Sequence, residues 1–270
     1  MSVKITCYQN FKTKLLKNGV LIIGFDYRNR PVNILNSEVM EELNTIARKE
    51  IQNKSVKAIV IVSLKNGSFI AGADINEIYS ITAENLDQAE NLIIKAHNLF
   101  DIIEKSGKPI IAAIEGACFG GGMELALACQ MRVATDHPKT VFGLPEVKLG
   151  IIPGFGGTQR LPKLVGLSTA FSMILKGNNV YPYKALKSGL IDDMVPYIPV
   201  ENKSIENIEK ESFVSAAIKK ALEYKHQTRK LPLKQRLWGM PVARRIALLK
   251  AKHDTKKAVR NYYPAQYKAI

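Results

Sequence analysis

Two glutamates have sequence surroundings that favour chemistry over packing. Glu124 lies in GGGMELALAC, directly after three glycines, and Glu146 lies in FGLPEVKLG, between a proline and a glycine-rich run. A carboxylate in an apolar segment is costly unless it is paired, hydrogen-bonded or protonated. Two such carboxylates, each beside glycines that expose the backbone, predict an acid–base pair that faces one pocket.

The glycines at 120–122 stand between an expected strand and an expected helix. Glycine lets the backbone approach a ligand closely, and the first N–H groups of a helix have no partner within it. Such N–H groups suit a developing oxyanion. A second donor is expected from the small residues at 71–74, after the strand expected at 57–64. The alternative is that these glycines only allow tight turns.

Other site chemistries are not supported by the residue spacing. Neither FGGGMEL nor PGFGGTQR has the G-x-G-x-x-G spacing of a dinucleotide site, and no glycine-rich loop ends in GK[ST]. No histidine or cysteine cluster predicts a metal site. Cys118 and Cys129 lie in apolar runs and are predicted to be reduced core thiols. Glu115, also in apolar company, is predicted to be a structural or rim residue.

The hydrophobic pattern predicts alternating strands and helices over the first 160 residues. The N-terminal 25 residues favour a hairpin of two strands, ITCYQNF and GVLIIGF, joined by KTKLLKN. Ser37 is the expected N-cap of a helix at 37–52, and an amphipathic helix is expected at 85–106. The expected strands further along are at 57–64, PIIAAIEGA, MRVAT and KTVFGL, and a helix is expected at MELALAC. This alternation predicts an α/β fold with a parallel sheet that is buried on both faces.

From Leu161 onward the pattern becomes helical. Short helices are expected at STAFSMILKG and PYKALKSG, with glycines at their ends. A charged amphipathic helix is expected at 204–226, and a basic helical tail at 227–262.

The charge of the chain is uneven. The net charge of the 270 residues is +15, and residues 201–270 hold 17 Lys/Arg against 6 Asp/Glu, a difference of +11. Solvated helix faces explain this excess, and so does attraction of a polyanionic small molecule. Nucleic acid is the third alternative, but no nucleic-acid-binding motif accompanies the charge. No apolar run is long enough to span a membrane, and we expect a cytoplasmic protein.

Four segments together resemble the crotonase, or enoyl-CoA hydratase, superfamily. They are AGADI (71–75), KPIIAAIEGACFGGGMELALAC (108–129), FGLPEVKLG (142–150) and IPGFGGTQRLPKLVG (152–166). The resemblance extends from about residue 3 to residue 196. The stretch from ACQMRVAT to PEVKLG is closer still to the hydratase half of the multifunctional fatty acid oxidation enzymes of the α-subunit type.

The resemblance implies a crotonase-like ββα spiral at 1–196, followed by a C-terminal helical region with a linker-like basic helix at 197–270. It implies that Glu124 activates water and that Glu146 exchanges a proton with the acyl α-carbon. The backbone N–H groups of Ala73 and Gly121 are the implied oxyanion hole. The positions implied to line the substrate site are Ala71, Asp74, Ile75, Pro145 and Gly154.

The implied activity is hydration of trans-2-enoyl-CoA to 3-hydroxyacyl-CoA in fatty acid β-oxidation, with acyl-CoA as substrate and no cofactor. The alternatives are a Δ3-Δ2-enoyl-CoA isomerase and a non-catalytic RNA-binding or scaffold relative. No dehydrogenase activity is expected, because the dinucleotide fingerprint is missing. The implied partners are further copies of the chain or the remainder of a larger fatty acid oxidation enzyme. Glu115 and Phe155 depart from the residues usual in this family.

Overall fold

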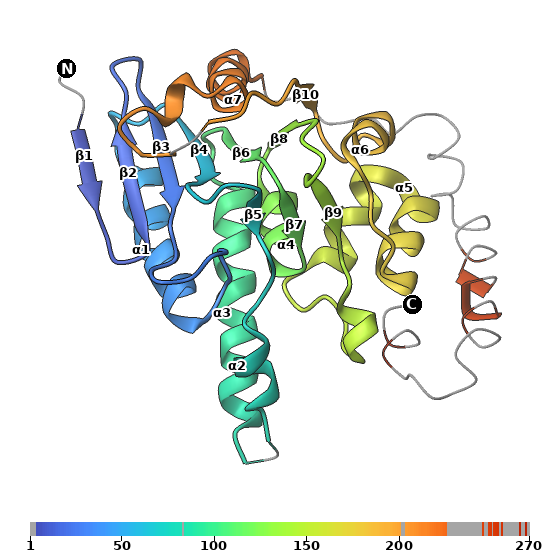
Figure 1. Cartoon of the computed structure of the whole chain (residues 1–270). Helices are drawn as coiled ribbons and strands as arrows, with labels where there is room; N and C mark the ends of the chain where they lie inside the picture. Colours follow the sequence, from blue (N-terminus) through green and yellow to red (C-terminus); the bar gives the residue numbers. More distant parts are fainter. Residues whose placement is uncertain are drawn as a thin grey trace.

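The computed structural model describes residues 4–82, 84–200 and 203–225, and a few single positions beyond 244. Within these residues a seven-stranded sheet has the strand order β1-β2-β3-β4-β6-β8-β10, and a three-stranded sheet has the order β5-β7-β9 (Figure 1). The strands are β1 (Lys4–Cys7), β2 (Phe11–Leu15), β3 (Val20–Phe25), β4 (Ala58–Ser63), β5 (Ser68–Ile70), β6 (Ile110–Ile114), β7 (Ala117–Phe119), β8 (Met131–Thr135), β9 (Val141–Gly143) and β10 (Asp193–Val195).

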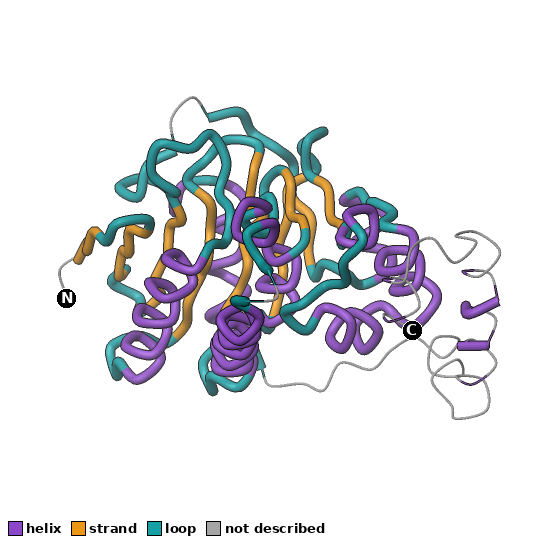
Figure 2. The backbone as a smooth tube through the Cα atoms, turned by 90° about the horizontal axis from the view of Figure 1, so that it is seen from below, coloured by secondary structure: helices purple, strands orange, loops and turns teal. Residues whose placement is uncertain are grey.

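Helices connect most of these strands. They are α1 (Ser37–Gln52), α2 (Ile75–Tyr79), α3 (Leu86–Glu104), α4 (Gly121–Ala128), α5 (Gly157–Lys176), α6 (Pro182–Ser188) and α7 (Ser212–Glu223), with short 3₁₀ helices η1 (Glu146–Leu149) and η2 (Ile208–Lys210). Figures 1 and 2 show the N-terminal strands at one side of the molecule and α5 and α6 at the other.

The sheets are mainly parallel. From β3 to β10 each neighbouring pair in the large sheet is parallel, and so are both pairs of the small sheet. Only β1, β2 and β3 pair antiparallel among the described strands. The α/β fold with a parallel sheet, predicted from the strand–helix alternation, is confirmed.

Both faces of the large sheet are buried. Because side chains alternate along a strand, neighbours point to opposite faces. Ile23 and Ile61 join a cluster with residues of α1, α3 and α4, whereas Ile22 and Val60 join a cluster with residues of α7. The helix α7 therefore belongs to the core of the sheet, although it follows residue 196, where the sequence suggested that the core ends.

The N-terminal segment forms three strands, so the predicted two-strand hairpin is wrong. The segment read as a linker contains β2, which pairs with both β1 and β3. It was misread because its lysines look like solvated loop residues. Lys14 is instead buried and forms an ion pair of 2.7 Å with Glu209, almost 200 positions away.

Three helix boundaries also differ from the sequence prediction. The N-cap of α1 is Asn36, whose side chain accepts the Val39 N–H at 2.9 Å, and not Ser37. The helix expected from residue 204 begins at Ser212. The helix expected at 168–177 is the second half of α5, which starts at 157 and is interrupted at Gly166, where φ is +76°.

Several remaining predictions concern the core and the tail. Cys118 and Cys129 are buried free thiols, as predicted. Among the described helices, none combines the length and apolar character that crossing a membrane requires. The basic tail predicted at 227–262 lies outside the continuously described residues.

Glu115 has a structural role, as predicted. Its carboxylate is buried and forms an ion pair of 2.8 Å with the buried Lys203. It also accepts the Gly67 N–H at 3.2 Å. This residue therefore links the segment before α7 to the end of β6.

Candidate functional site

A cavity of about 530 Å³ lies beside the N-termini of α2 and α4. Its walls come from the start of α1 and the loop before it, from α2 and the loops on either side of it, from the first half of α3, from the start of α4, and from the segment from Pro145 to Phe155. The structure brings together here every site residue predicted from the sequence: Ala71, Ala73, Asp74, Ile75, Gly121, Glu124, Pro145, Glu146 and Gly154.

Glu124 lies in the first turn of α4 and is 1% exposed. Its Oε1 accepts two backbone hydrogen bonds, from the N–H of Phe155 and of Gly157, both at 2.8 Å. Burial raises its pKa to about 7, against the opposing effects of these two bonds and of the nearby Arg160 charge. The carboxylate is thus costly to ionise, but it is held in place for that state.

Glu146 is the first residue of η1, directly after Pro145. Its Oε2 is buried and makes no hydrogen bond to any described residue. Burial, with the charge of Glu124 second, raises its pKa to about 8. A buried carboxyl oxygen without a partner needs an explanation, and a water or a substrate in the cavity would supply the partner.

Together the two carboxyls form a coupled pair. Each is desolvated, and the charge of Glu124 disfavours ionisation of Glu146. Such a pair holds one proton between its two titration steps, which belong to the pair as a whole. Near neutral pH the better-stabilised charge is that of Glu124, which accepts two backbone N–H groups, so Glu124 suits the base and Glu146 suits the acid.

Two backbone donors border the same cavity. The N–H groups of Ala73 and Gly121 find no acceptor among the described residues, whereas the adjacent Asp74 and Gly120 N–H groups bond to Leu35 O and Gly143 O. Gly120, the N-cap of α4, has φ of +49°, and a Cβ there would lie 3.2 Å from Glu146 Oε1. Glycine is therefore required at this turn, which presents the first N–H groups of α4 to the cavity.

The remaining predicted residues shape the wall. Asp74 caps α2 by accepting the Asn76 N–H at 2.8 Å, and Ile75 is half exposed at the rim. Gly154 has no heavy atom near its missing Cβ, so the cavity is open there. The ring of Phe155 packs edge-on against Phe100, with ring centroids 5.9 Å apart.

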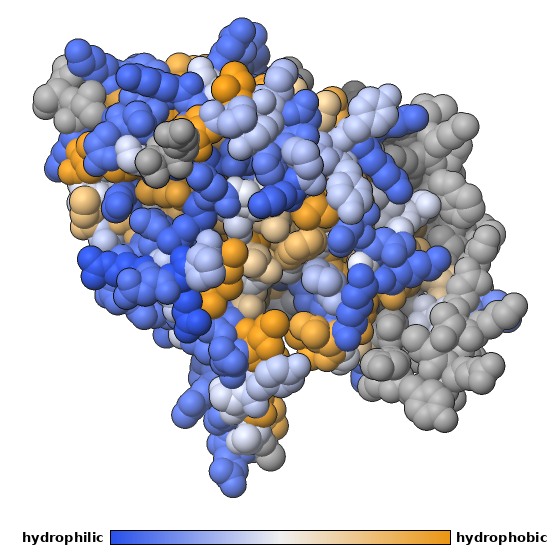
Figure 3. All heavy atoms as spheres, viewed as in Figure 1, coloured by the Kyte–Doolittle hydropathy of each residue, from blue (hydrophilic) through white to orange (hydrophobic). Residues whose placement is uncertain are grey.

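Sequence reasoning missed a set of apolar wall residues. Figure 3 shows apolar side chains gathered around α2, at the lower part of the molecule. The cavity wall includes seven large aliphatic residues: Ile78, Ile81, Leu92, Ile93, Leu149, Ile151 and Ile152. In the sequence they resemble ordinary helix and loop residues, and only the contact between distant segments shows that they form one surface. The wall suits a long apolar group.

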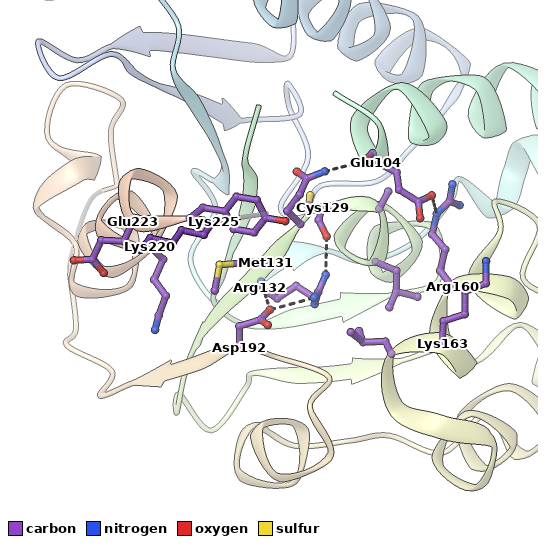
Figure 4. A pocket seen from close by; sticks show the side chains of 15 residues that line it. Glu104, Cys129, Met131, Arg132, Arg160, Lys163, Asp192, Lys220, Glu223 and Lys225 are labelled. Carbon is purple, nitrogen blue, oxygen red and sulfur yellow. Dashed lines mark hydrogen bonds and ion pairs between the residues drawn. The ribbon is translucent and has the colours of Figure 1, made fainter. Parts of the chain in front are cut away.

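A second cavity, of about 1140 Å³, lies at the C-terminal end of α4 (Figure 4). Its polar lining serves the fold. Arg132 bonds to the carbonyls of Ala126, Cys129 and Leu190 and pairs with Asp192. The smaller cavity is therefore the candidate active site, since it holds both perturbed carboxyls.

Replacing Glu146 with glutamine should stabilise the protein at high pH. The raised pKa means that the unfolded chain releases this proton at lower pH than the folded protein, so stability falls as pH rises from about 4.5 towards 8. Glutamine removes this effect. We compare the change in unfolding free energy that E146Q causes at pH ~9 with the change it causes at pH ~5. It should be more favourable at pH ~9 by about 4 kcal/mol. Denaturant unfolding at the two pH values measures this, and an equal effect at both would contradict the raised pKa.

The chain resembles known proteins over nearly its whole length. The family model described as "Enoyl-CoA hydratase/isomerase" matches residues 16–252. A fatty acid oxidation complex subunit alpha from Idiomarina loihiensis is 41% identical over 263 residues, which are 96% of this chain and 35% of that protein. The chain thus spans about a third of the length of this curated relative.

Solved structures share the fold. An enoyl-CoA hydratase from Bacillus anthracis has a TM-score of 0.64 at 29% identity, covering 83% of this chain and 76% of that one. One from Geobacillus kaustophilus has a TM-score of 0.70 at 25% identity, covering 98% and 94%. The crotonase-like fold that the sequence motifs implied is thereby confirmed.

Proposed function

Because the chain belongs to the enoyl-CoA hydratase/isomerase family, we propose that it adds water to trans-2-enoyl-CoA to give 3-hydroxyacyl-CoA. One observation carries the proposal. Two desolvated carboxyls with raised pKa face the same cavity as two backbone N–H groups that have no acceptor among the described residues. The two carboxyls can each transfer a proton, and the two N–H groups can stabilise a negatively charged oxygen.

In the proposed reaction the thioester carbonyl accepts hydrogen bonds from the Ala73 and Gly121 N–H groups. These bonds strengthen as enolate charge develops on the oxygen, so they favour the transition state over the bound substrate. Ala73 comes from the loop after β5 and Gly121 from the N-terminus of α4.

The two glutamates divide the proton transfers. Glu124, ionised, takes a proton from water as the water oxygen bonds to the β-carbon. Glu146, protonated, gives its proton to the α-carbon, which completes the addition. The pair still holds one proton, which is now on Glu124, and transfer of this proton to Glu146 through a water molecule restores the starting state. The chain itself supplies acid, base and oxyanion donors, so we propose the reaction with no cofactor and no dehydrogenase step.

We also propose that the substrate comes from fatty acid oxidation. The fatty acid oxidation subunit that this chain resembles supports that setting, and the aliphatic wall from Ile78 to Ile152 suits an acyl chain. In that setting the chain would act as the hydratase portion of a larger assembly, or as an assembly of its own copies.

The test is an assay of enoyl-CoA loss with crotonyl-CoA, octenoyl-CoA and hexadecenoyl-CoA, with identification of the 3-hydroxy product. We expect hydration of at least one of these substrates. Incubation with a 3-enoyl-CoA separates the isomerase alternative, which needs proton transfer but no water. Formation of 2-enoyl product without any hydration of 2-enoyl-CoA would overturn the proposal.

A further inference from the structure

The turn at residues 155–157 fixes one oxygen of Glu124. The N–H groups of Phe155 and Gly157 both bind Oε1 at 2.8 Å, while Oε2 makes no hydrogen bond to a described residue. Any movement of this turn moves the carboxylate. The position of Glu124 therefore depends on what holds the turn, and the turn itself contains two glycines.

Arg160 also holds this turn, through the carbonyl of Phe155. Its guanidinium is almost fully buried and donates from Nη1 to the Phe155 carbonyl at 3.0 Å. It donates from Nη2 to Asp101 Oδ1 at 2.7 Å and from Nε to Glu104 Oε2 at 2.9 Å. Figure 4 shows Arg160 and Glu104 pointing toward each other at the edge of the larger cavity. All three nitrogens of the guanidinium thus donate a hydrogen bond, and these bonds anchor the turn to α3.

Gly156 is shaped for this contact. Its φ is +99°, and a Cβ at this position would lie 2.3 Å from Arg160 Nη1. The guanidinium therefore lies directly against bare backbone, in a place where any side chain would displace it. The turn and the arginine form one fitted unit.

The charges around this unit come from three elements. Arg160 on α5 contributes the buried cation, Glu146 on η1 the second site carboxyl, and α3 contributes Asp101, Glu104 and His97. Asp101 also pairs with Lys105 at 2.8 Å. The two acids of α3 are about half exposed, so solvent screens them, whereas the guanidinium is buried beside Glu124. The cation therefore acts on Glu124 with little screening, and it lowers the pKa of Glu124 against the larger effect of burial.

We propose that Arg160 is a positioning residue for Glu124. It clamps the 155–157 turn against Asp101 and Glu104, so that Oε1 is held and Oε2 is left to bind the reacting water. It also supplies the positive charge that favours the ionised base. The inference rests on the proposed hydration, but the effect on the Glu124 carboxyl is a property of the protein alone.

Two substitutions at Arg160 separate geometry from charge. R160K keeps the charge and loses the planar fork, whereas R160Q loses both. We expect R160Q to lower kcat for crotonyl-CoA by about 10²-fold with a much smaller change in KM, because the base is misplaced. The acidic limb of its pH profile, which reports ionisation of Glu124, should move to higher pH. R160K should lose kcat but keep the limb near its original position. K163Q, which removes an exposed cation from the same helix, is the matched control and should change neither.

A second readout does not require catalysis. Isotope-edited infrared titration of the Glu124 carboxyl in the E146Q background should show a higher pKa with R160Q than with R160K or K163Q. If the wild-type protein does not hydrate enoyl-CoA, the proposed function fails while this titration still decides the role of Arg160. If R160Q does not fold, R160K and the pair D101N/E104Q test the clamp through kcat. Wild-type kcat in R160K, or a Glu124 titration and pH limb in R160Q that match K163Q, would overturn the inference.

Discussion

Glutamine in place of Glu124 or Glu146 should lower the turnover of crotonyl-CoA by about 10²–10⁴-fold without unfolding the protein. Glutamine has the shape of glutamate but neither takes nor gives a proton at neutral pH. In E124Q the amide oxygen can still accept the N–H groups of Phe155 and Gly157, so the turn at 155–157 should stay in place. In E146Q no hydrogen bond to a described residue is lost at Oε2.

The two variants should also differ in pH dependence. E124Q removes the base, whose ionisation raises activity, and E146Q removes the acid, whose ionisation lowers it. In the pH profile of the residual rate, E124Q should therefore lose the acidic limb and E146Q should lose the basic limb. The measurement is steady-state hydration across pH, with E41Q as the control, since Glu41 is an exposed carboxylate on α1. Near-wild-type turnover in both site variants would refute the acid–base assignment.

Replacing Lys203 with methionine should lower the free energy of unfolding by about 3–5 kcal/mol. The side chains of Lys203 and Glu115 are 2% and 5% exposed, and their charged atoms lie 2.8 Å apart. Methionine fills similar space but leaves Glu115 buried without its cation. Glu211 is also nearby and buried, and burial raises its pKa while Lys203 lowers it. Loss of the lysine therefore leaves two acids in a poorly solvated site.

A double-mutant cycle isolates this pair. K203M leaves the charge of Glu115 buried without a counter-ion, and E115Q removes that charge. The double variant should therefore regain much of the lost stability. Denaturant unfolding measures each free energy, and K219M, at an exposed position of α7, is the control. If K203M costs no more than K219M, the buried ion pair does not stabilise the fold.

The sequence was most informative where one local pattern decides the outcome. Glu124 and Glu146 were identifiable because a carboxylate beside glycines in an apolar run has few explanations. The helix at 85–106 was predicted within two residues of α3 because Ala96, Leu99 and Ile103 repeat at helical spacing and all face the core. Such patterns are contained within a few turns of chain, so no tertiary information is needed.

Long-range pairing was invisible in the same sequence. Lys14 and Lys203 looked like solvated lysines, because their acidic partners lie far away in the chain. The donors that hold Glu124 were hidden for another reason. The glycines of PGFGGTQR were noticed, but which carboxylate would meet the N–H groups of Phe155 and Gly157 depends on how α4 and α5 pack. Arg160 was missed because its proposed positioning role depends on contacts to Asp101 and Glu104, which lie on another helix.

The way α7 covers the sheet limits how this fold can be transplanted into another protein. A fragment that ends at residue 196 would lack Phe213, Val214 and Ala217. It would expose the apolar surface formed by Ile22 and Val60. It would also strand Lys14 and Glu115 without their counter-ions. Such a fragment should aggregate and precipitate. A fragment that continues to residue 225 includes α7, which covers that surface.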